Sequence, residues 1–198
     1  MKSAKNFFNS CWITLSRRSL LFTVINTVYF GSIFTSTLLM QWWFPAPPNG
    51  EFVEFPGFAF TDWGLPALVL SIFLFNLIVS GFILTTLTGL MFFVLPLAIL
   101  VWRATIWGAL LNGLSTPMLL LALPTLIFEG EGYVLTSVAG VILGLSWLKH
   151  SLIYGNEPIS RGEALKKAFK EATRLFIWVT ILLFVAALIE GFTIAWLA

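Results

Sequence analysis

Four ionisable residues lie inside stretches that are otherwise apolar enough to sit in a membrane: Arg103, Glu129, Glu131 and Glu190. An isolated charge at the bilayer centre costs about 2.5–3.5 kcal/mol on insertion scales, so such a residue persists only when it is paired, hydrated or protonated. The simplest arrangement pairs Arg103 with Glu129 or Glu190. Two interpretations stay open: a buried ion pair that locks helices together, or a path for an ion, a proton or a polar solute.

Weaker polar signals accompany these charges. Asn26, Asn76 and Asn112 are able to form hydrogen bonds between helices or to a ligand. Small residues four positions apart let two helices approach closely, and the chain has two such pairs, Gly140–Gly144 and Ala104–Gly108. We expect these pairs to pack inside one chain, with contact between two copies as the alternative.

The residues that common catalytic and cofactor sites require are missing. His150 is the single histidine, so neither an HExxH motif nor a histidine-based triad exists, and a GxxxxGK[ST] phosphate loop is absent. The single cysteine, Cys11, allows no internal disulfide and no thiolate metal cluster. The sequence therefore predicts a protein that is not an enzyme, with no catalytic residue, metal ion or cofactor.

Composition determines the class of protein that must position the four charges. Of 198 residues, 59% are hydrophobic and 10% are charged, and mean hydropathy is +0.95. A soluble domain carries about 25% charged residues. This composition excludes a soluble enzyme, a disordered chain and a nucleic-acid binder. It predicts a single membrane domain over residues 1–198, folded as an all-α bundle.

About 20 apolar residues are needed for a helix to cross the membrane. Five stretches qualify, at residues 19–40, 65–87, 90–111, 117–148 and 175–197. The connection between the second and third, at Thr88 and Gly89, is then very short. The first stretch is too long for the apolar region of a signal peptide, so we expect it to be retained as an anchor.

The fourth stretch is longer than a span requires, because 32 helical residues would rise about 48 Å. Pro124 removes a backbone donor, and residues 129–132, Glu-Gly-Glu-Gly, are poor helix formers. The sequence thus predicts a broken span with halves at 118–128 and 133–148. A re-entrant hairpin is the competing interpretation.

Two basic segments flank the spans. Residues 3–18 place five apolar side chains on one helical face, as in a helix that lies on a membrane surface: Phe7, Phe8, Cys11, Trp12 and Leu15. The second basic segment is residues 149–174. Within it, the capping box Ser160-x-x-Glu163 predicts the start of a second amphipathic helix. Its predicted apolar stripe contains Leu165, Ala168, Phe169 and Ala172.

Charge asymmetry predicts the orientation. Ten of the eleven lysines and arginines lie in the N-terminal arm or in residues 149–174, whereas the proline-rich loop at 42–64 has none. Positive segments stay on the cytoplasmic side. With five crossings, the N-terminus is cytoplasmic, the 42–64 loop external, and the cell membrane the location.

The chain resembles the stage II sporulation protein M family of small prokaryotic membrane proteins with about five spans. The likeness rests on Ala186–Phe192, AALIEGF, and on Pro124–Gly144, PTLIFEGEGYVLTSVAGVILG. In the second stretch Pro124, Glu129, Gly140 and Gly144 fit the family pattern, but Thr125 and Leu126 stand where the family usually has His and Gly. In endospore formers the resemblance implies a membrane scaffold that works with sporulation proteins D and P.

These observations predict a non-enzymatic scaffold or subunit of a membrane protein complex. The alternative is a channel or transporter that uses Arg103, Glu129, Glu131 and Glu190. Expected partners are a bilayer with anionic lipids, which the basic segments would contact, and other membrane proteins. Homo-oligomers are possible in this scheme, and nucleic acid is not a partner.

Overall fold

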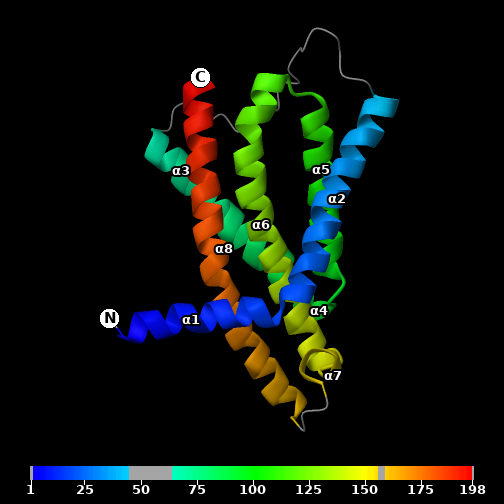
Figure 1. Ribbon diagram of the computed structural model, residues 1–198, viewed down its shortest axis with the longest axis vertical. Helices are drawn as coiled ribbons and strands as arrows, with labels where there is room; N and C mark the ends of the chain where they lie inside the picture. The colour runs from blue at the N-terminus through cyan, green and yellow to red at the C-terminus, as the bar shows by residue number, and fades with distance from the viewer. Residues whose placement is uncertain (1, 45–63, 156–158, 198) are drawn as a thin grey trace.

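A computed structural model describes residues 2–44, 64–155 and 159–197, with side chains from residue 9 to residue 196 within these ranges. These residues form helices and no strands (Figure 1), so the predicted all-α bundle is confirmed. The elements are α1 Lys2–Arg17, α2 Ser19–Trp43, α3 Leu65–Leu74, the π-helix η1 Phe75–Leu87, α4 Thr88–Met91, α5 Leu95–Asn112, α6 Thr116–Leu148, α7 Ser151–Tyr154 and α8 Arg161–Leu197.

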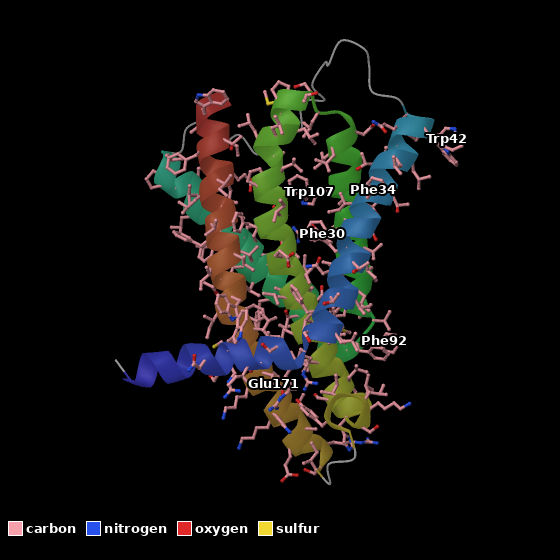
Figure 2. The ribbon with its side chains drawn as sticks, in the orientation of Figure 1. Phe30, Phe34, Trp42, Phe92, Trp107 and Glu171 are labelled. Atoms are coloured by element: carbon pink, nitrogen blue, oxygen red, sulfur yellow. The ribbon has the colours of Figure 1, made fainter. Side chains whose placement is uncertain are left out.

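Within the described ranges, five helical segments are long and apolar enough to cross a membrane: α2, the continuous run Leu65–Met91, α5, α6 and α8. The protein is therefore a multi-pass membrane protein. Exposed apolar side chains cover the outside of the bundle. Figure 2 shows Phe34, Trp42 and Phe92 pointing outward, whereas Phe30 and Trp107 point between α6 and the α2–α5 pair.

The hairpin between the second and third spans turns later than predicted. Helix continues through Thr88 and Gly89 to Met91, and the turn lies at residues 92–94, just before Pro96 in the first turn of α5. Thirteen residues of the second span form a π-helix. Its i→i+5 hydrogen bonds place more residues in each turn than an α-helix does, so the span needs a longer segment. Gly89 instead allows close contact with Gly140 of α6.

The predicted break in the fourth span is wrong, because α6 is one helix of 33 residues with Pro124 inside it. Pro124 is exposed and near the start of the helix. The glycines do not interrupt the helix but admit neighbouring side chains. A Cβ on Gly130 would lie 2.6 Å from Tyr29 Cε1, and one on Gly132 would lie 2.7 Å from Leu183 Cδ2. A continuous helix also excludes the re-entrant hairpin.

Helix α6 is the centre of the bundle. From Gly132 to Gly144 every residue is buried, which explains why the stretch is apolar on all sides. Helix α8 lies along one side of α6, and α2 and α5 pair with each other on another (Figure 1).

The predicted surface helix that begins at the Ser160 capping box is continuous with the last span, and together they form α8, of 37 residues, whereas residues 151–154 form the separate helix α7. The capping box of α8 is present: Glu163 Oε2 accepts hydrogen bonds from the Ser160 backbone N–H and hydroxyl, both at 2.8 Å. The buried face differs in part from the prediction. Ala168 and Ala172 are buried, but Phe169 is 45% exposed, and Ala164 belongs to the buried face instead.

Helix α1 lies across the bundle (Figure 1), the orientation expected of a helix in the membrane surface. It crosses α8 where Arg174 Nη1 donates to Thr14 Oγ1 at 3.4 Å and Trp12 meets Trp178 edge-to-face. From residue 178 to 197, α8 rises about 29 Å, close to the thickness of the hydrocarbon core. In the predicted apolar stripe of α1, Cys11 is buried and Trp12 is exposed, whereas Phe7 and Phe8 lie outside the described side chains.

Candidate functional site

Arg103 lies against α6 in the middle of the bundle. Its Nη2 donates a hydrogen bond to Tyr133 Oη at 2.8 Å, and the same nitrogen is 3.8 Å from Glu129 Oε1. The guanidinium carbon lies 3.7 Å from the centroid of the Tyr133 ring, a cation–π distance. Because Glu129 and Tyr133 are one turn apart on α6, they present the carboxylate and the ring on one face of the helix.

Tyr29 of α2 completes this intramembrane centre. The side chain is fully buried, packs over Gly130, and lies within electrostatic reach of Glu129, Arg103 and Glu131. Among the described residues its hydroxyl has no hydrogen-bond partner. Neither Tyr29 nor Tyr133 is among the residues predicted from the sequence, although both tyrosines fall within apolar spans near the predicted charges.

The other two predicted acids do not contact Arg103. Both Glu131 carboxylate oxygens accept hydrogen bonds from Asn26 Nδ2 at 2.8 Å, so Glu131 faces α2. Glu190 of α8 is half-buried and interacts electrostatically with Glu129, and it forms no hydrogen bond or ion pair with the described part of the chain. Of the two predicted partners of Arg103, the structure places Glu129 beside it.

The remaining predicted residues pack helices together. Gly140 meets Pro96 and Gly144 meets Phe93, at virtual Cβ distances of 2.7 and 2.8 Å, so both seat the hairpin of the second and third spans on α6. Gly108 faces Ser36 of α2, with buried Ala104 one turn before it. Asn76 is buried in η1, and Asn112 Nδ2 donates to the Phe44 carbonyl at 3.0 Å.

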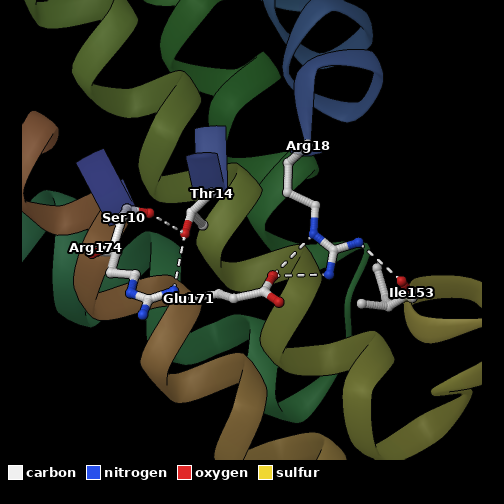
Figure 3. Close-up of polar contacts among 6 residues, drawn as sticks. All are labelled: Ser10, Thr14, Arg18, Ile153, Glu171 and Arg174. Carbon is white, nitrogen blue, oxygen red and sulfur yellow. Dashed lines mark hydrogen bonds and ion pairs between the residues drawn. The ribbon is translucent and has the colours of Figure 1, made fainter. Parts of the chain in front are cut away.

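A second polar centre joins three segments at the level of α1 (Figure 3). Arg18 donates from Nε and Nη2 to Glu171 Oε2 and from Nη1 to the Ile153 carbonyl at 2.9 Å. Its guanidinium also lies 5.3 Å from the centroid of the Tyr154 ring. We call these residues, Arg18, Ile153, Tyr154 and Glu171, the boundary latch. Glu171, which was not among the predicted site residues, is buried.

A groove of about 650 Å³ opens on the outer surface between α2 and α5. Hydroxyl and small side chains line much of it, among them Thr27, Gly31, Ser32, Thr35 and Thr105. None of the predicted intramembrane charges is among its lining residues. The groove faces the surrounding membrane rather than the polar centre.

The chemistry available at the intramembrane centre is charge pairing and proton binding. Within the described ranges, no group of three His, Cys, Asp or Glu side chains is placed to hold a metal ion. The guanidinium is satisfied by a phenol oxygen, an aromatic face and a carboxylate, all from α6. This geometry joins α5 to α6 at mid-membrane.

Comparison with known proteins identifies the family. The sequence model described as Stage II sporulation protein M matches residues 19–193, nearly the whole chain. The chain belongs to the stage II sporulation protein M family. The resemblance in the sequence is thereby confirmed. The match begins at the first residue of α2 and ends near the end of α8, so it includes all five spans of this family member. No curated protein and no solved structure matches the chain.

Proposed function

We propose that the protein is a non-enzymatic subunit of a membrane protein complex that holds partner proteins in the cell membrane, with its N-terminus in the cytoplasm. The observation that carries the proposal is that three of the four intramembrane charges pair with neighbouring side chains: Arg103 with Tyr133 and Glu129, and Glu131 with Asn26. Groups held in this way stabilise the helix bundle. The α2–α5 groove, by contrast, opens toward the membrane, where a partner helix would lie.

Small and hydroxyl residues support this use of the groove, because they let helix backbones approach closely. Gly31 is the clearest case, since a Cβ added there would meet nothing within 4 Å. Packing inside this chain therefore does not require a glycine at position 31. A helix from either a second copy of the chain or another membrane protein would fill the groove.

Anionic lipids are the second proposed partner. Helix α1 presents exposed Trp12 and Ile13, and Arg17 is exposed at its C-terminal end. Apolar and cationic side chains together bind a membrane surface that contains anionic lipids. We expect higher thermal stability in nanodiscs with phosphatidylglycerol than in phosphatidylcholine alone, and Arg17→Gln should reduce this difference.

The competing hypothesis is transport of an ion or a proton by Arg103, Glu129, Glu131 and Glu190. Two measurements test it. The first reconstitutes the pure protein in liposomes and follows ion and proton flux with and without Glu129→Gln. The second isolates the tagged chain from its native membrane in mild detergent and identifies the proteins that co-purify. The proposal expects no flux and a membrane protein that co-purifies in fixed ratio. Flux that Glu129→Gln abolishes, with no partner, would overturn it.

A further inference from the structure

The membrane-spanning segments carry more acidic than basic residues. Helix α2 and the second span have no charged residue, α5 has Arg103, α6 has Glu129 and Glu131, and α8 from residue 178 onward has Glu190. If all three acids were ionised, the spans would hold two uncompensated negative charges. Such charges are costly in lipid, so the excess has to be neutralised by a bound cation or by protons.

Two of the three acids have a donor within the bundle. Glu129 lies 3.8 Å from Arg103 Nη2, and Glu131 accepts from Asn26 Nδ2 at 2.8 Å. Glu190 has neither a hydrogen bond nor an ion pair with any described residue, and the charged group with which it interacts is Glu129, of the same sign. Glu190 is therefore the acid that no donor in the described bundle stabilises as a carboxylate.

The elements packed around this part of α8 bring no cation to it. A Cβ added at Gly191 would lie 2.5 Å from Val69 Cγ2 and 3.6 Å from Leu65 Cδ1, so α3 packs directly beside Glu190. Neither α3 nor η1 contains an ionisable residue. Helix α6, which lies along α8, has no ionisable residue before Glu129. Glu129 is thus the one ionisable group that these described elements direct toward Glu190.

The position of Glu190 along α8 places it inside the hydrocarbon core. It follows Trp178, which meets α1 at the membrane surface, by 12 residues or about 18 Å. It precedes Leu197, at the end of the helix, by seven residues or about 10 Å. Because the core is about 30 Å thick, the side chain lies about a third of the way in from the end of α8.

A proton fits this site better than a metal ion. Metal cations such as Ca²⁺ are held by several oxygen ligands. Within the described ranges, no group of three His, Cys, Asp or Glu side chains is placed to supply them. A proton needs only one carboxylate oxygen, and the carboxylic acid that results is neutral and still both donates and accepts a hydrogen bond.

We propose that Glu190 is an intramembrane proton-binding site, and that loss of its proton weakens the packing of α8 on α6. Deprotonation would place a second carboxylate within electrostatic reach of Glu129, and the two negative charges would repel each other across the contact between the helices. This inference is independent of the proposed function, because a bound proton requires neither flux nor a partner.

Infrared difference spectroscopy tests the site on the pure full chain in phosphatidylcholine nanodiscs. A protonated carboxyl group gives a carbonyl stretch that shifts in heavy water, and a carboxylate lacks this band. The proposal expects the band at about pH 6, where an exposed glutamate is ionised, and its decline as the pH is raised. Glu190→Gln should lower the band by at least a third, because only three acids lie in the spans. The control Glu163→Gln, exposed in the capping box of the same helix, should leave it unchanged.

Thermal unfolding over the same pH range is the second measurement. An acid that is neutral in the folded protein favours the fold at low pH and loses this contribution as the pH rises. The unfolding midpoint of the wild-type protein should therefore fall as the pH rises, and Glu190→Gln should remove most of this fall.

Three results would overturn the proposal: no carboxyl band at about pH 6, an equal band in the Glu190→Gln protein, or an unchanged pH dependence of unfolding in that variant. Glutamine has the size of the neutral acid, so the variant should reach the membrane at the wild-type level. Failure of Glu190→Gln to fold would also count against a neutral carboxyl group. A protein without the band that still co-purifies with a partner would leave the proposed function intact.

Discussion

Arg18 and Glu171, 153 positions apart in the chain, meet through two hydrogen bonds to one carboxylate oxygen, at 3.0 and 2.8 Å. The two side chains are only 11% and 6% exposed. Arg18 is the residue between the surface helix α1 and the first span α2. The pair therefore holds the junction between α1 and α2 against α8. Arg18 Nη1 also donates to the Ile153 carbonyl of α7.

Loss of Arg18 should loosen this junction. Arg18→Gln leaves the buried Glu171 carboxylate without its charged donor, a change worth about 2 kcal/mol of unfolding free energy. We expect a lower midpoint of thermal unfolding in detergent and faster amide hydrogen exchange in α1. Arg17→Gln, at the exposed neighbouring position, is the control and should change stability by less than about 0.5 kcal/mol. Equal effects of the two variants would contradict the latch.

The intramembrane pair should show strong coupling. Breaking a buried pair by removing one partner costs about 3 kcal/mol or more, whereas replacing both with apolar residues costs less. Arg103→Met and Glu129→Met should each lower the free energy of unfolding, and the double variant should recover at least half of the summed loss. Denaturation in mild detergent measures all three variants. Additive losses would show that the two side chains do not stabilise each other.

Glycine contacts give a third prediction. In Gly144→Ala the new methyl group would collide with the Gly89 carbonyl and lie 2.8 Å from Phe93 Cβ. We expect a loss of about 1–3 kcal/mol, as for other overpacked sites. Gly31→Ala is the matched control on a spanning helix, because its methyl group enters open space. Alanine's higher helix propensity should make that variant neutral or more stable. A stable Gly144→Ala protein would argue against the close packing of α6 on the hairpin.

The predicted orientation can be tested by cysteine labelling. The test uses single cysteines at the exposed positions Ser115 and Lys166 in a Cys11→Ala background. Ser115 directly precedes α6 and Lys166 lies near the start of α8, so the two positions are at opposite ends of the bundle. A membrane-impermeant maleimide added to intact cells should label Ser115→Cys and leave Lys166→Cys unlabelled until the membrane is opened. The reverse pattern would invert the topology, and labelling of both in intact cells would refute the five crossings.

Local sequence was sufficient for the spans and the helix cap. Hydropathy over about 20 residues identified α2, α5 and α8, and the Ser160–Glu163 spacing predicted a cap that is present. Helix length and helix propensity gave a wrong prediction for α6, because Pro124 and the glycines at 130 and 132 were interpreted as a break in the helix. In a central helix, glycine provides room for a neighbouring ring, and that neighbour is visible only in the fold.

The sequence by itself determined that the chain is a helical membrane protein, because the number and length of its apolar runs leave no other way to satisfy the backbone in lipid. It also identified the charges that such a protein has to accommodate. Only the tertiary structure decided their partners: Arg103 with Tyr133 and Glu129, Glu131 with Asn26, and Arg18 with Glu171. Each pair joins residues of different segments of the chain, from consecutive helices for Arg103 to segments 153 positions apart for Arg18 and Glu171. The helix rotations and heights that bring them together are set by packing against α6, and hydropathy carries no information about either.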